Sequence, residues 1–301
     1  MKNLKNSAFI LFLLSIFSLC LYAADDSTEE MDFSEPYLGN IDAGAWSQVG
    51  TRHMESEDTY LCEPIGQYFN ISRHTDYIFG VFDGHGGKKV SEYLMATLKL
   101  LIVAGIGPEK DHNKIESALL NAFNIADNSV RSIKKQGSTA LVVLLIDDVL
   151  YIANAGDSRA VLCREQDGQI NITTTNDHKP TYESEKIRIE KAGGQVIFFQ
   201  GAYRVGGNLS CSRSIGDHPK QLGLSAVPEI FIIKLNPSHK LLALGSDGVF
   251  DVLSNQKVVE LAKRSISLRN VEKAAKVIVN SAKNAGSPDD LTAIVVSFKW
   301  L

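Results

Sequence analysis

The chain has 301 residues, of which 44% are hydrophobic and 22% charged, so it is long enough and apolar enough to bury a large core. Its formal net charge is −4 and no basic patch stands out, which argues against a nucleic-acid-binding protein. Its four cysteines have no regular spacing and no CxxC pair, which argues against a disulfide framework, a zinc knuckle or a redox dithiol.

The N-terminus has the pattern of a secretory signal peptide. Lys2 and Lys5 precede an apolar stretch over residues 8–21, and the small residues Ala23-Ala24 follow it. We therefore expect residues 1–24 to be a cleaved leader and the protein to be exported, to the periplasm or out of the cell. The apolar stretch is short for a membrane span, but an uncleaved segment that anchors the protein in a membrane is the alternative.

Residues 25–39 are acidic and lack periodicity, so we expect a flexible linker there and a single folded domain over residues 40–301. Short apolar runs that end at Gly or Asp predict buried strands. They occur over residues 77–82, 138–146, 149–155, 160–163, 195–199, 230–233, 240–244 and 292–298.

Apolar side chains recur at helical spacing over residues 90–101, 115–133 and 271–282. A shorter helix is expected over residues 183–192, ending at a pair of glycines. Strands gathered in runs, with helices gathered in pairs, predict an α+β fold of layered antiparallel sheets.

Acidic residues cluster at the ends of several predicted strands. Each cluster alone is typical of an ordinary turn. Together they predict carboxylates that converge in space, which repel one another unless protons or cations neutralise them. A ligand set made of oxygen atoms alone suits Mg²⁺ or Mn²⁺ rather than zinc. The clusters are Glu57-Asp58, Asp83, Asp157, Asp247 with Asp251, and Asp289-Asp290.

Seven segments in order resemble the motifs of the metal-dependent Ser/Thr protein phosphatases of the protein phosphatase 2C (PPM) family, over residues 45–300. They are VFDGHGG at 81–87, GSTA at 137–140, AGDSRA at 155–160, DHKP at 177–180 with EKIRIEKAGG at 185–194, LSCSRSIGD at 209–217, SDGVFD at 246–251 and DDLT at 289–292.

The resemblance implies a β-sandwich of two antiparallel sheets flanked by pairs of helices, with a binuclear centre of Mg²⁺ or Mn²⁺ in a cleft at one end. It implies that Asp83 bridges the two ions and that the Gly84 carbonyl binds one of them. The remaining implied ligands are Asp247 and Asp289 at the second ion, Glu57 and Asp58 acting largely through water, and Asp157 and Asp251 at a weaker third ion.

Two further residues are candidates for catalysis. His85 lies two positions after Asp83, so its ring can protonate the leaving group, although a ring that only bonds a carboxylate is the alternative. Arg52 is the candidate for gripping the phosphate. The chain departs from the family here, because four residues rather than three separate Arg52 from Glu57-Asp58. Either a bulge absorbs the extra residue or Arg52 points elsewhere, and Met54-Glu55-Ser56 is a competing match to the Glu-Asp pair.

The motifs at 177–180 and 209–217 also contain charged residues. We interpret Asp177 and His178 as structural. Arg213 and Asp217 either form an internal ion pair that organises a loop or take part in catalysis.

The resemblance implies metal-dependent hydrolysis of phosphoserine and phosphothreonine in proteins, by a metal-activated water. The partners expected are phosphorylated proteins, with no nucleic acid and, once the leader is removed, no membrane, and we expect a monomer. An inactive relative that binds a partner is disfavoured, because Asp83, Asp247 and Asp289 are all present. A small phosphoester as the substrate is a third possibility.

Overall fold

The computed structural model describes residues 36–267 and 270–301. The predicted signal peptide and most of the predicted linker lie outside the described residues. Within those residues, no helix is long and apolar enough to cross a membrane.

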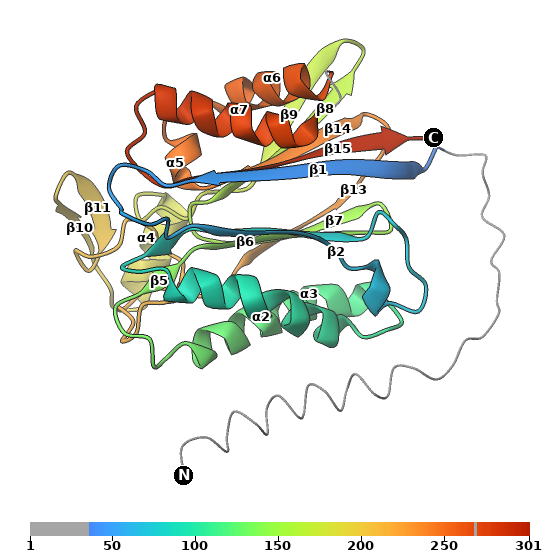
Figure 1. The fold of residues 1–301 in the computed structure, drawn as a ribbon. Coiled ribbons are helices and arrows are strands. Elements are labelled where there is room, and N and C mark those ends of the chain that lie inside the picture. Colours follow the sequence, from blue (N-terminus) through green and yellow to red (C-terminus); the bar gives the residue numbers. More distant parts are fainter. Residues whose placement is uncertain (1–35, 268–269) are drawn as a thin grey trace.

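Two five-stranded antiparallel sheets stack face to face (Figure 1). This confirms the predicted sandwich. The first sheet has the order β1 (Leu38–Gln48), β15 (Leu291–Trp300), β14 (His239–Gly245), β8 (Arg159–Gln166) and β9 (Gln169–Thr174). The second has the order β13 (Glu229–Lys234), β7 (Val149–Ala155), β6 (Ala140–Ile146), β3 (Tyr77–Phe82) and β2 (Thr59–Pro64).

A pair of helices covers the outer face of each sheet, giving four layers (Figure 1). The outer face of the second sheet packs against α2 (Lys89–Ile106) and α3 (His112–Ser129), and that of the first against α6 (Asn255–Ile266) and α7 (Val271–Asn284). Side chains cap three of these helices, since Asp111, Ser254 and Asn270 each accept a bond from a backbone N–H in the first turn.

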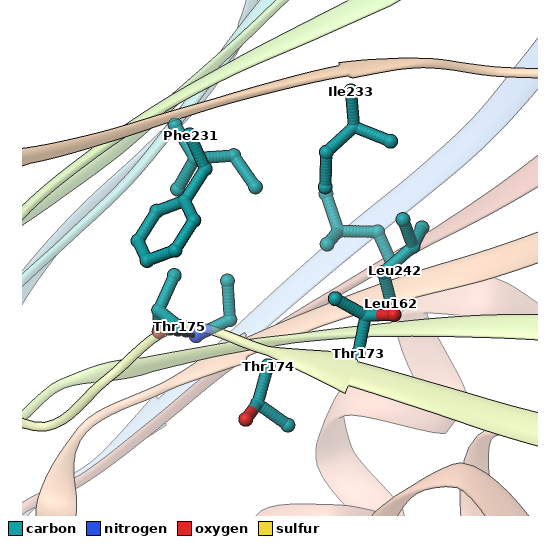
Figure 2. Close-up of a pocket in the computed structure, with 9 residues that line it drawn as sticks. Leu162, Thr173, Thr174, Thr175, Phe231, Ile233 and Leu242 are labelled. Atoms are coloured by element: carbon teal, nitrogen blue, oxygen red, sulfur yellow. Dashed lines mark hydrogen bonds between the residues drawn. The ribbon is translucent and has the colours of Figure 1, made fainter.

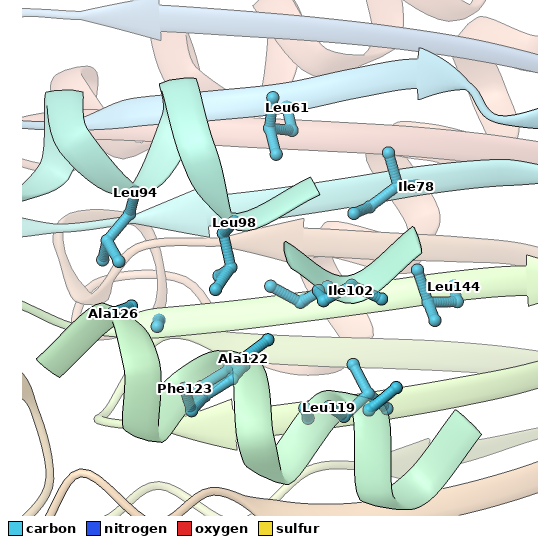
Figure 3. Close-up of a cluster of buried hydrophobic side chains, with 14 of the residues drawn as sticks. Leu61, Ile78, Leu94, Leu98, Ile102, Leu119, Ala122, Phe123, Ala126 and Leu144 are labelled. Carbon is cyan, nitrogen blue, oxygen red and sulfur yellow. The ribbon is translucent and has the colours of Figure 1, made fainter. Parts of the chain in front are cut away.

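The sandwich is buried on both faces, so its central strands are continuously apolar. Along β6, Val142 and Leu144 point toward the α2–α3 layer, whereas Leu141 and Val143 point between the two sheets. Figure 3 shows the first of these interfaces, where Leu98 of α2 and Leu119 of α3 belong to one buried apolar cluster with Ile78 and Leu144 of the sheet. Each such buried side chain contributes about 1.5–3 kcal/mol relative to exposure.

The strand β1 begins at Leu38, two residues before the predicted start of the folded domain at residue 40. Leu38 is only 2% exposed and pairs with Trp300 on β15. The strand is hidden in the sequence because glycine, alanine and polar residues separate its few large apolar side chains. Six strands (β1, β2, β4, β9, β11 and β12) and the helices α5 and α6 were not predicted.

The open edge of the sandwich contains a small apolar pocket. Phe231 and Ile233 of β13 lie there opposite Leu162 and Leu242 of the other sheet (Figure 2). Its lining has no titratable group, so it is a packing gap between sheets and not a catalytic site.

The smaller elements gather at one end of the sandwich (Figure 1). They are the three-stranded sheet of β4 (Gly84–His85), β5 (Gly137–Ser138) and β12 (Ile215–Gly216), the hairpin of β10 (Val196–Phe199) and β11 (Ala202–Val205), and the helices α4 (Glu183–Lys191) and α5 (Asp247–Phe250). A short 3₁₀ helix, η1 (Gly66–Tyr68), follows β2.

Candidate active site

The predicted site residues converge on one open cleft at this end of the sandwich. Two of them do not line its main part: Asp58 is buried beneath it, and Asp251 lines the adjoining part, beside Lys179. The eight that line the cleft are Arg52, Glu57, Asp83, Gly84, His85, Asp157, Asp247 and Asp289.

Asp83 is fixed at the end of β3 by its own backbone. Its N–H donates to Thr139 Oγ1 over 3.1 Å, and its carbonyl accepts from the Thr139 N–H over 2.9 Å. The Thr139 hydroxyl also shares a 2.8 Å hydrogen bond with that of Ser158, next to Asp157. The chain crosses the Glu57 backbone at Gly84, where a Cβ would overlap the Glu57 carbonyl and sit 2.9 Å from Ser91 Oγ. Only glycine fits this approach, which brings Glu57 beside Asp83.

Asp58 lies beneath the lining of the cleft and is 6% exposed. The Ser246 hydroxyl donates to Asp58 Oδ2 over 2.9 Å, and Oδ1 has no hydrogen-bond partner among the described residues. Ser246 is also the N-cap residue of α5, whose first residue is Asp247. The residue that precedes Asp247 therefore holds the carboxylate of Asp58, which comes from a distant part of the chain.

Burial and mutual repulsion raise the pKa values of the central carboxylates. Burial and the charge of Asp58 raise the pKa of Asp83 well above its usual value, and burial and Asp157 do the same for Asp247. Burial raises the pKa of Asp157, and it raises that of Asp58 to about 7. The cleft therefore has an excess of negative charge that favours bound cations.

These carboxylates fit hydrated divalent ions. No group of three or more His, Cys, Asp or Glu side chains within residues 36–267 and 270–301 is close-set enough to form a ready metal cage. The carboxylates ring the cleft instead, and the buried Asp58 Oδ1 has no hydrogen-bond partner in the part of the chain that the structure describes. Mg²⁺ keeps several of its waters and takes few protein ligands directly, so a ring of spaced oxygen atoms suits it.

His85 forms a close pair with Asp217. Its Nε2 lies 2.8 Å from Asp217 Oδ1 and 2.9 Å from Oδ2, and the Ser214 hydroxyl donates to Oδ2 over 2.6 Å. The small sheet brings them together, since His85 on β4 and Gly216 on β12 both pair with Gly137 on β5. Burial acts to raise the pKa of Asp217, but the bond to His85 lowers it overall.

The loop before Glu57 absorbs the extra residue as a surface bulge, in which Met54 is fully exposed. Asp290 organises this loop by accepting from the backbone N–H groups of Gly50 and Glu57, each over 2.8 Å, and by bonding His53 over 3.0 Å. The burial of His53 acts to lower its pKa, but the bond to Asp290 raises it overall.

Arg52 stays at the cleft, with its Nη1 2.5 Å from Asp289 Oδ2. Glu55 points away from the cleft to Lys88, which argues for Glu57-Asp58 over the competing match.

The remaining charged motif residues form ion pairs next to the cleft. Asp177 forms two bonds with Arg159, over 2.9 and 2.6 Å, as expected of a structural residue. Of the two alternatives for Arg213 and Asp217, the internal ion pair is wrong. Arg213 pairs instead with the buried Glu185 at 2.6 Å, because α4 lies directly against its loop, and Asp217 is left for His85.

Two further residues matter that the sequence analysis did not assign to the site. Asp217 holds His85, and Lys179 lies between two predicted metal ligands, 3.1 Å from Asp251 Oδ1 and 3.7 Å from Asp157 Oδ2. Both residues lie within recognised motifs, at 209–217 and 177–180, and this position is the feature of the sequence that could have indicated a role at the site.

Comparison with known proteins matches these features to one family. The family model for protein phosphatase 2C matches residues 43–291. The chain is 36% identical over 293 residues to probable protein phosphatase 2C 54 of Oryza sativa subsp. japonica, covering 91% of this chain and 78% of that protein. It is 39% identical over 226 residues to probable protein phosphatase 2C 59 of Arabidopsis thaliana, covering 73% of this chain and 70% of that protein.

The fold has a solved counterpart. The crystal structure of serine-threonine phosphatase 2C from Toxoplasma gondii matches with a TM-score of 0.73 at 24% identity, covering 88% of this chain and 98% of that one. This confirms the predicted fold class.

Proposed function

Because this chain belongs to the protein phosphatase 2C family and is a protein-serine/threonine phosphatase, we propose that it removes phosphate from phosphoserine and phosphothreonine in proteins by a route that depends on two Mg²⁺ or Mn²⁺ ions. One observation carries the proposal. Buried carboxylates with raised pKa values surround a single cleft that also contains an arginine and a paired histidine.

The carboxylates would hold the ions. Asp83, the Gly84 carbonyl, Asp247 and Asp289 are the proposed direct ligands, and Glu57 and Asp58 act largely through water. Two bound divalent ions lower the pKa of water enough to supply a nucleophile at neutral pH, and they offset the charge of the phosphate dianion.

The protein's own side chains bind and orient the substrate. Arg52 lies at the mouth of the cleft and is 59% exposed, so its guanidinium can grip two phosphate oxygens. Phosphate on Arg52 competes with Asp289, its partner in this structure. Substrate binding and the freeing of the Asp289 carboxylate therefore favour each other.

His85 is the proposed general acid. In the protonated ring, Nε2–H donates to Asp217, which fixes the ring and leaves Nδ1–H for the serine or threonine oxygen that departs. Asp217 is a positioning residue, because it contacts His85 rather than the substrate.

The direct test is hydrolysis of a phosphothreonine peptide with Mn²⁺, with Mg²⁺ and with excess EDTA. We expect turnover with either ion, none in EDTA, and recovery when the metal is returned. Asp247→Asn should remain folded and lose turnover, whereas Asp167→Asn, in the exposed turn between β8 and β9, should behave like the unchanged protein. Full activity in excess EDTA would overturn the metal-dependent route.

We also propose that the protein is exported and that it is a monomer. The support for export is the pattern of Lys2, Lys5, the apolar stretch over residues 8–21 and Ala23-Ala24, which is typical of a cleaved leader. An uncleaved leader that anchors the enzyme in a membrane is the alternative.

A further inference from the structure

We propose that Lys179 is a built-in competitor at the third metal position: its ammonium group occupies the space between Asp157 and Asp251, and a divalent ion must displace it to bind there. This inference rests on the proposed function, since it concerns the weakest of the ions that the cleft would hold.

The geometry places the ammonium where a cation would be bound. Lys179 Nζ donates to Asp251 Oδ1 over 3.1 Å and lies 3.7 Å from Asp157 Oδ2. The lysine also lines the same part of the cleft as Asp247 and Asp251. Its side chain is 29% exposed and Asp157 is almost fully buried, so this is not an ordinary surface ion pair.

The backbone at Lys179 is held beside the metal position, so the ammonium group is tethered there. The His178 N–H donates to the Gly156 carbonyl over 2.9 Å, and the Gly156 N–H donates to His178 Nδ1 over 3.2 Å. Pro180 follows and restricts the chain further. A group tethered so close to its partners has a high local concentration, which a free ion must overcome.

A lysine and a divalent ion cannot share this position without a large cost. Two positive charges about 3–4 Å apart repel strongly in a partly buried site. When the ion binds, the ammonium must therefore move toward solvent. Asp251 is 57% exposed, so the outer side of the site is open for that movement.

The test is a titration with Mn²⁺ of the full folded protein, by calorimetry or equilibrium dialysis, comparing the unchanged protein with Lys179→Met. The expected result is an unchanged affinity for the two tighter ions and a roughly tenfold lower dissociation constant for the weakest ion. Lys179→Arg, which keeps the charge, should not give this gain.

Lys263→Met is the matched control. Lys263 pairs with Glu165 and is 34% exposed, close to the 29% of Lys179, but it lies on α6, outside the cleft lining. It should leave all Mn²⁺ affinities unchanged. If the weakest Mn²⁺ binds Lys179→Met with unchanged or lower affinity, the inference about Lys179 is wrong and the proposed function still stands. If neither the unchanged protein nor any variant binds Mn²⁺ tightly, the proposed function is wrong.

The unchanged protein offers a second readout that needs no substitution. Mn²⁺ at concentrations that fill the weakest position should release the Lys179 amine and raise its rate of reductive methylation severalfold, measured by peptide mass spectrometry with Lys263 as internal reference. An amine that reacts no faster when the weakest ion is bound would contradict displacement, whatever Lys179→Met shows.

Discussion

Asp58→Asn should stabilise the metal-free protein at alkaline pH, although it removes a group proposed to support metal binding. Asp58 is buried, Ser246 bonds one of its oxygen atoms, and the other oxygen has no partner among the described residues. Asparagine has nearly the same shape and can still accept the Ser246 hydrogen bond, but it carries no charge to bury.

The size of the effect follows from the pKa of Asp58. Burial raises this pKa from 3.8 to about 7. A difference of one unit in pKa corresponds to about 1.4 kcal/mol, so ionisation of Asp58 destabilises the folded state by roughly 4 kcal/mol at most. Since the folded protein binds this proton more tightly than the unfolded chain, the contribution of Asp58 to stability falls as the pH rises from about 4 to about 7. Part of this cost is repulsion that the neighbouring carboxylates also contribute to, so we expect Asp58→Asn to increase the free energy of unfolding by about 2–4 kcal/mol at pH 8.

Urea unfolding in EDTA at pH 5 and pH 8 measures this directly. The unfolding midpoint of Asp58→Asn should exceed that of the unchanged protein at pH 8, and the difference should shrink at pH 5. Added Mn²⁺ should narrow the gap at pH 8, because bound metal stabilises the unchanged protein more. Asp167→Asn is the surface control. A variant that is less stable at pH 8 in EDTA, or a gain independent of pH, would refute the reasoning.

Three further outcomes are expected. His85→Ala should slow hydrolysis of a phosphothreonine peptide by roughly 10²–10⁴-fold and barely slow p-nitrophenyl phosphate, whose leaving group needs no proton; equal losses in the two rate assays would contradict the acid role. Gly137→Ala should give the same pattern in a protein whose circular dichroism is unchanged, because the new Cβ would lie 2.5 Å from His85 Nε2 and overlap Asp217. N-terminal sequencing of protein from its native cell should show cleavage just after Ala23 or Ala24, and an intact N-terminus on membrane-bound protein would favour the anchored alternative.

The central strands and three of the four packed helices were predictable because their burial leaves a direct pattern in the sequence. Along β6, every residue is buried, so a continuous apolar run marks the strand. By contrast, β9 has mostly exposed residues and β1 lies at a sheet edge, so neither has a strong pattern. The helix α6 begins with polar residues after a short turn, and its buried face includes a serine beside Val258, Val259 and Ala262, so its apolar pattern is weak.

The site was predictable in composition but not in pairing. The carboxylates of the recognised motifs lie at one cleft, as expected. The partner of each charged group, however, depends on which strands and helices lie side by side. Asp217 meets His85 only because β4 and β12 flank the same two-residue strand, β5. Arg213 meets Glu185 because α4 packs against its loop. Neither contact can be read from spacing along the chain, since His85 and Asp217 are 132 residues apart.

The positively charged side chains next to the carboxylates also predict the order of affinity of the proposed metal positions. The outer carboxylates each have a tethered cation, Arg52 on Asp289 and Lys179 on Asp251. At Asp83, by contrast, the charges with the largest effect on its pKa are carboxylates, which raise it. A divalent ion at the inner position therefore relieves repulsion without displacing any side chain, whereas one at an outer position must first displace an arginine or a lysine. We expect the inner ion to bind tightest and the ion between Asp157 and Asp251 to bind weakest, in the order in which the protein's own cations oppose them.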